Sequence, residues 1–174
     1  MGGVPTRSVV RAGLIAGAGG IFVALVGLYT KFADLALVGE QITLGRLLIL
    51  APALVAAYAV TRPRIVAGER RSVPFGPGVA VGVMTALIGG AVFAAAVAFA
   101  DWFGVDRIRE VFVAVTEELI DFLTFDKGVP GGLPQLIGLC VVGGAIGGFA
   151  RTAPETVRRP ASAGILVVIL FGLL

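Results

Sequence analysis

One uncharged stretch of the chain, GVAVGVMTALIGGAVFAAAVAFA, extends from Gly78 to Ala100. An α-helix rises about 1.5 Å per residue, so about 20 apolar residues cross the hydrocarbon core of a bilayer. Strands of a membrane barrel alternate apolar and polar side chains, whereas this stretch is apolar on every side. The stretch therefore predicts a helix embedded in lipid.

Four further apolar runs resemble it in composition. They cover residues 12–29, 44–60, 133–150 and 161–174. The whole chain is 57% hydrophobic and 14% charged, whereas about a quarter of the residues in a soluble domain are charged. We therefore expect a single membrane domain over residues 1–174, an all-α polytopic bundle of about five spans. The last run is too short for a full crossing, so the fifth span is expected to be incomplete.

The charged residues divide unequally between the two sides of these spans. The connections on the side of the N-terminus carry nine basic and two acidic residues, and those on the other side carry five basic and nine acidic residues. Lys and Arg are enriched in cytoplasmic loops, so the N-terminus is expected in the cytoplasm. The basic residues form no stripe with interleaved aromatics, which argues against a nucleic-acid partner.

Residues 105–125, VDRIREVFVAVTEELIDFLTF, combine apolar side chains at helical spacing with charged ones between them. This pattern predicts one amphipathic helix on the outer side, lying on the bilayer or on the ends of the spans. Glu117, Glu118 and Asp121 are candidates for an ion site or a catalytic pair of carboxylates. Adjacent helical residues point apart, and no basic or metal-binding residue accompanies Glu117 and Asp121, so a solvated helix face is favoured.

The residues outside this segment indicate close packing of helices and not a catalytic or ion-binding site. The chain has no histidine, and no Asp, Glu or Lys lies in the middle of a predicted span. Pairs of glycines spaced by four residues are typical of helices that approach closely in lipid. These pairs are Gly13 and Gly17, Gly78 and Gly82, Gly143 and Gly147, and Gly144 and Gly148. We predict no enzyme activity and no catalytic, cofactor or metal residues, and the substrate-binding residues are unknown.

Three segments in this order resemble a known family. They are EQITLGRLLILAPALVAAYAVTR (residues 40–62), RIREVFVAVTEELIDFLTF (residues 107–125) and GGLPQLIGLCVVGGAIGGFA (residues 131–150). The set resembles the N-terminal membrane extension of permeases of the branched-chain amino acid type of ABC importer. The resemblance implies a transporter segment with an accessory or structural role, in a bacterial inner (plasma) membrane. It also implies an ABC ATPase and a periplasmic solute-binding protein as partners, through a permease core that this sequence lacks.

The apolar run at residues 161–174 is relevant to whether the sequence covers the whole protein. A helix that stopped inside the bilayer would leave carbonyl groups without partners in hydrocarbon. We therefore expect the sequence to be the N-terminal fragment of a longer chain. The alternative is a stand-alone small membrane scaffold subunit of a larger complex. On either reading the partners include the lipid bilayer and other transmembrane helices.

Overall fold

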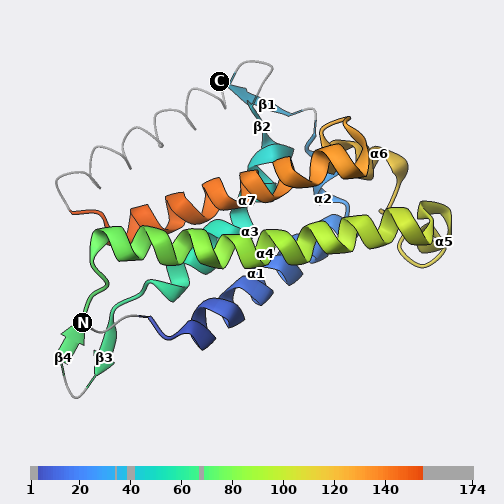
Figure 1. The fold of residues 1–174 in the computed structure, drawn as a ribbon. Helices are drawn as coiled ribbons and strands as arrows, with labels where there is room; N and C mark the ends of the chain where they lie inside the picture. The colour runs from blue at the N-terminus through green and yellow to red at the C-terminus, as the bar shows by residue number, and fades with distance from the viewer. Residues whose placement is uncertain (1–3, 34, 39–41, 67–68, 155–174) are drawn as a thin grey trace.

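The computed structural model describes residues 4–33, 35–38, 42–66 and 69–154 (Figure 1). Four long helices dominate it: α1 (Thr6–Leu25), α3 (Leu44–Val60), α4 (Phe75–Phe103) and α7 (Gly128–Thr152). Three short helices connect them: α2 (Leu28–Lys31), α5 (Val105–Arg109) and α6 (Glu117–Thr124). Two antiparallel ribbons complete the described fold, β1 (Ala36–Val38) with β2 (Ile42–Thr43) and β3 (Arg64–Val66) with β4 (Glu69–Arg71). The prediction of a helical fold is confirmed, and the ribbons are additions to it.

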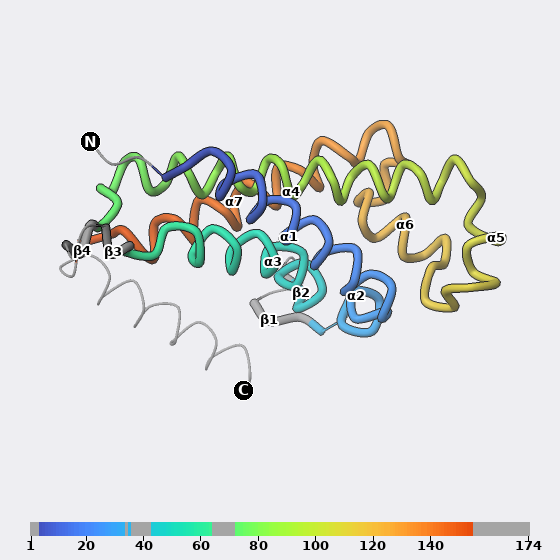
Figure 2. Tube along the Cα trace, turned by 90° about the horizontal axis from the view of Figure 1, so that it is seen from below, coloured from blue at the N-terminus to red at the C-terminus, as the bar shows by residue number. Residues whose placement is uncertain are grey.

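The four long helices lie side by side along one axis, so the bundle has two ends (Figures 1 and 2). One end holds the starts of α1 and α4, the β3–β4 ribbon and the end of α7. The other end holds α5 and α6, whereas the β1–β2 ribbon lies beside the start of α3, nearer the middle of α4, and α2 lies between the ribbon and that end. We call the two ends the basic end and the acidic end, because exposed Arg7, Arg11 and Arg62 lie at the first and most of the described acidic residues lie at the second.

Three helices are long and apolar enough to cross a membrane, which indicates a membrane protein. They are α1, α4 and α7. The second predicted span corresponds to α3, which is apolar but has only 17 residues. It continues through Pro52 and spans about 25 Å. The predicted fifth run, residues 161–174, lies outside the described residues. The described residues contain three candidate spans and one shorter apolar helix.

Glycine contacts hold the long helices together, as the four-residue spacing predicted. A Cβ atom built on Gly82 of α4 would collide with the carbonyl oxygen of Gly144 in α7. One built on Gly17 of α1 would lie 2.9 Å from the carbonyl oxygen of Gly89, and one on Gly143 would lie 2.7 Å from that of Leu50 in α3. Backbones therefore touch where α4 meets α7, where α1 meets α4 and where α3 meets α7.

The prediction of a single amphipathic helix at residues 105–125 is wrong. The structure has two helices there, α5 and α6, separated by turns and irregular backbone at residues 110–116. Thr116 caps the start of α6, because its side chain accepts a hydrogen bond from the backbone N–H of Leu119 at 3.2 Å. The β-branched residues between the two helices add to the break because they fit a helix less well.

The largest apolar core lies toward the acidic end, where α6 packs against the long helices. Leu119 and Leu123 of α6 are almost fully buried, in one cluster with Phe93 of α4 and Leu136 of α7. Tyr29 of α2 joins the same cluster, with its ring centroid 6.0 Å from that of Phe93. The α6 helix thus buries one of its sides in the core of the bundle.

Candidate functional site

The interior of the described bundle contains few polar side chains: the Tyr29 hydroxyl donates at 3.4 Å to the carbonyl oxygen of Gly20 in α1, and the buried threonines bond to their own helices. Thr61, Thr85 and Thr124 are buried, and each donates its hydroxyl proton at 2.8 Å to the carbonyl oxygen four residues earlier. Cys140 is a buried free thiol. Among the described side chains, no buried nitrogen or oxygen lacks a hydrogen-bond partner. The described interior therefore offers no unsatisfied polar group to a solute or an ion.

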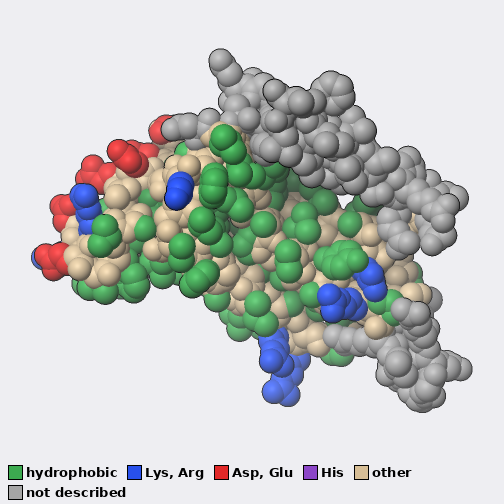
Figure 3. Space-filling model, turned by 180° about the vertical axis from the view of Figure 1, so that it is seen from behind, with side chains coloured by type: hydrophobic (Ala, Val, Ile, Leu, Met, Phe, Trp, Pro, Cys, Tyr) green, Lys and Arg blue, Asp and Glu red, His purple; other side chains and the backbone are tan. Residues whose placement is uncertain are grey.

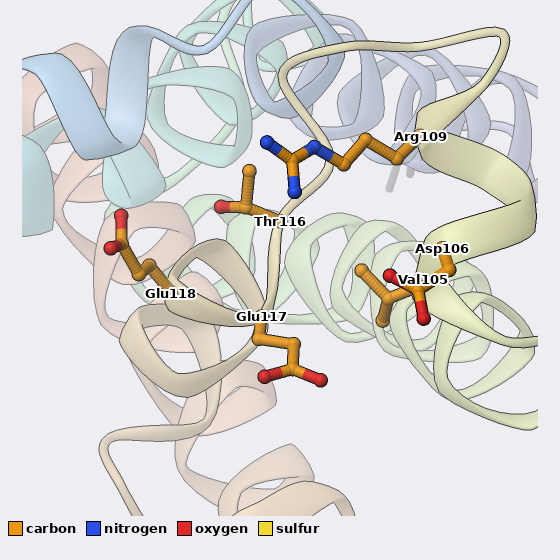
Figure 4. A pocket seen from close by; sticks show the side chains of 6 residues that line it. All are labelled: Val105, Asp106, Arg109, Thr116, Glu117 and Glu118. Carbon is orange, nitrogen blue, oxygen red and sulfur yellow. The ribbon is translucent and has the colours of Figure 1, made fainter.

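A polar hollow of about 370 Å³ opens between α5 and α6 at the acidic end (Figure 4). Its lining consists of Val105, Asp106, Arg109, Thr116, Glu117 and Glu118. In Figure 4 the Arg109 side chain extends from α5 toward Thr116, whereas Glu117 and Glu118 point in different directions. This is the divergence expected of adjacent helical residues, and it confirms that the two carboxylates do not converge on one atom.

A second hollow of about 460 Å³ lies between α2 and α6. Its lining consists of Thr30, Ala33, Glu118, Asp121, Phe122 and Asp126. Three of these residues carry carboxylates, but within the described residues no group of three or more His, Cys, Asp or Glu is arranged to hold a metal ion. Glu118 and Asp121 are exposed, as the prediction of a solvated helix face requires.

The basic end carries a pairing between α7 and α3 that the sequence did not predict. Arg151 donates a hydrogen bond of 3.0 Å to the Tyr58 hydroxyl, and its guanidinium carbon lies 5.1 Å from the centre of the Tyr58 ring. Thr152 donates at 3.4 Å to the carbonyl oxygen of Phe75, which joins α7 to the start of α4. These contacts fix the ends of three helices, and they leave Arg151 half-exposed.

An apolar groove of about 450 Å³ follows the boundary between α1 and α3. Ile15 and Phe22 of α1 and Pro52 and Val55 of α3 are among the residues that line it. Ile15, Phe22 and Val55 are each at least 60% exposed, so the groove lies on the outside of the bundle. Its position between two apolar helices suits a lipid chain or another transmembrane helix.

The sequence predicts no catalytic or cofactor residues, and it does not predict the two polar hollows beside α6. One local signal could have indicated the first hollow. Thr116 followed by two acidic residues is typical of a helix start, and it lies within the single helix predicted at residues 105–125. No known protein family, curated protein or solved structure matches this chain.

Proposed function

We propose that this chain is an integral membrane segment of a transporter permease, with an accessory or structural role. One observation carries the accessory role: the long helices meet backbone to backbone through their glycines, which closes the bundle where α4 meets α7, where α1 meets α4 and where α3 meets α7. The buried threonines of the described interior are already bonded to their own helices. A translocation path would need polar groups that face a cavity between the spans.

The outer surface supports contacts with lipid and with other transmembrane helices. Large hydrophobic side chains such as Phe22, Val55 and Met84 are more than half exposed along the bundle. Such side chains cost little free energy in lipid and much in water. We further propose that the basic end faces the cytoplasm, because Lys and Arg favour that side of the membrane.

The transporter class rests on the resemblance to the N-terminal extension of ABC importer permeases for branched-chain amino acids. On this proposal the substrates are amino acids or similar small solutes. An ABC ATPase and a periplasmic solute-binding protein would act with the permease core. The bundle described here would contribute membrane anchorage and a surface for the helices of that core.

The test is the composition of the complex in native membranes. The protein, tagged in its own organism, would be extracted into lipid nanodiscs and its partners quantified by mass spectrometry. We expect an ABC ATPase in a fixed ratio, and ATP-dependent uptake of an amino acid after reconstitution of the complex. The chain reconstituted by itself is the control and should show no uptake.

Two results would overturn the proposal. Uptake by the chain alone would place the transport path within this bundle and remove the accessory role. A fixed set of partners that contains no transporter component would instead identify a scaffold subunit of another membrane complex.

A further inference from the structure

We infer that the acidic end carries a lipid-interface anchor, built from aromatic and β-branched side chains at the end of α4 and in the turn after α5. Six exposed residues form it, and we call them the interfacial patch: Phe99, Trp102, Phe103, Val111, Phe112 and Val113. Its partner is the headgroup layer of the bilayer. The inference concerns where the chain meets lipid and does not depend on the transporter class.

The length of α4 places the first part of the patch. Its 29 residues extend about 43 Å, which exceeds a hydrocarbon core of about 30 Å. Neighbouring helices show which part crosses the core. Near the basic end Gly78 contacts Thr152, the last residue of α7, and α1 contacts α4 from Gly13 against Ile88 to Gly20 against Phe93. About 20 residues counted from Gly78 reach Val97, so the last turns of α4 lie in the interfacial layer.

The side chains in those last turns are the kind that this layer favours. Trp102 is 80% exposed, and the rings of Phe99 and Phe103 are stacked with centroids 5.6 Å apart. The Phe99 and Trp102 centroids are 6.0 Å apart. Tryptophan is enriched at membrane–water interfaces, because its ring is apolar while its N–H needs a hydrogen-bond partner. In water, three adjacent exposed aromatic rings would be an unfavourable surface.

The turn after α5 provides the second part of the patch. Val111 and Val113 are 74% and 77% exposed, although Val115 two residues later is buried in the core. In Figure 3 the acidic side chains gather along one edge of this end of the molecule, and hydrophobic side chains cover the surface beside them. One side of the acidic end is thus suited to water and the other to lipid.

The charges beside the patch indicate which lipids it needs. Residues 99–113 hold three acidic residues, Asp101, Asp106 and Glu110, and two basic ones, Arg107 and Arg109, so their formal net charge is −1. A segment without net positive charge gains little from anionic headgroups, in contrast to polybasic segments. The anchor should therefore work in zwitterionic membranes and respond little to salt.

Trp102 is the only tryptophan in the sequence, so its fluorescence reports on the patch directly. The full chain would be reconstituted in phosphatidylcholine vesicles with bromine atoms near the headgroup, at mid-chain or near the chain end. We expect the strongest quenching by the shallow bromines, and no change when anionic lipid is added. Val113→Trp in a Trp102→Phe background should give the same shallow profile.

Two matched controls, also in the Trp102→Phe background, calibrate the depth. Met84→Trp places the probe on an exposed side of α4, in the part of this helix that is expected to cross the hydrocarbon core of the bilayer. Its fluorescence should be quenched most by deep bromines. Glu118→Trp places it on the exposed polar side of α6, and should be quenched by aqueous acrylamide and not by bromolipids.

The same profiles can overturn the inference in three ways. Trp102 that behaves like the Glu118→Trp control would lie in water, and Trp102 that behaves like Met84→Trp would lie in the hydrocarbon core. Trp102 that is shielded from both acrylamide and bromolipids would be covered by protein, either a partner or a second copy of this chain. A deep or aqueous profile for Val113→Trp alone would remove the turn from the anchor.

Discussion

Gly144→Ala is expected to destabilise the bundle, because α7 approaches α4 most closely at this residue. A Cβ atom at position 144 would lie 2.5 Å from the carbonyl oxygen of Gly82 and would also collide with the Ala86 Cβ atom. Neither neighbour can rotate away, since one is backbone and the other is a single methyl group. The two helices must separate, and overpacking of this kind costs about 1–3 kcal/mol.

Gly138→Ala is the matched control, because it makes the same change in the same helix. A Cβ atom at position 138 would meet no heavy atom within 4 Å. Both variants gain the same helix propensity, about 1 kcal/mol relative to glycine, so this gain cancels when they are compared. The difference in unfolding free energy between Gly138→Ala and Gly144→Ala should therefore equal the overpacking cost of about 1–3 kcal/mol.

The assay is reversible unfolding of the purified chain in mixed micelles with increasing dodecyl sulfate, followed by the helical circular dichroism signal. We expect Gly138→Ala to match or exceed the parent protein in stability and Gly144→Ala to fall below both. Equal stability of the two variants would refute the close approach of α4 and α7 at this level of the bundle.

Three further changes have defined outcomes in the same unfolding assay. Thr116→Ala removes the cap on Leu119 and should cost about 1 kcal/mol. Tyr58→Phe removes the 3.0 Å hydrogen bond from Arg151 but keeps the ring, so the loss should be about 1 kcal/mol and smaller than that of Tyr58→Ala. Gly104→Ala forces a side chain onto a backbone with φ of 98° and should cost about 1–3 kcal/mol, although the surrounding space is open.

The helices could be predicted from the sequence because hydropathy is a local property. The apolar run at residues 78–100 became the centre of α4, and the run at residues 133–150 became most of α7. The helix ends could not be predicted, since backbone hydrogen bonds continue past the apolar residues. The α4 helix therefore includes Asp101 and Trp102, and α7 begins at Gly128.

The acidic end was predicted less well, because its structure depends on contacts between distant residues. The apolar spacing at residues 105–125 fits one helix, but burial of Val115 and Leu119 against α4 favours two helices with a turn between them. Thr116 with its acidic successors was a local signal of the second start. The two ribbons were not predicted, since strands of two or three residues are too short to show an alternating pattern.

The glycines show what four-residue spacing in a sequence can and cannot predict. Four-residue spacing predicted close packing, and the structure confirms it at all four pairs. The spacing does not say which helix each glycine meets, and adjacent glycines in α7 have different partners. Gly143 lies on Leu50 of α3, and Gly144 lies on Gly82 of α4. This difference follows from the angle of about 100° between neighbouring helical residues.

The central claim is that the basic and acidic ends lie on opposite sides of a membrane, with the basic end in the cytoplasm. The most direct test is labelling of single cysteines by a membrane-impermeant maleimide, in a Cys140→Ala background that removes the chain's only cysteine. Glu118→Cys should be labelled on intact spheroplasts, and Arg62→Cys only after the membrane is permeabilised. Labelling of both sites on intact spheroplasts, or of Arg62→Cys alone, would contradict the account.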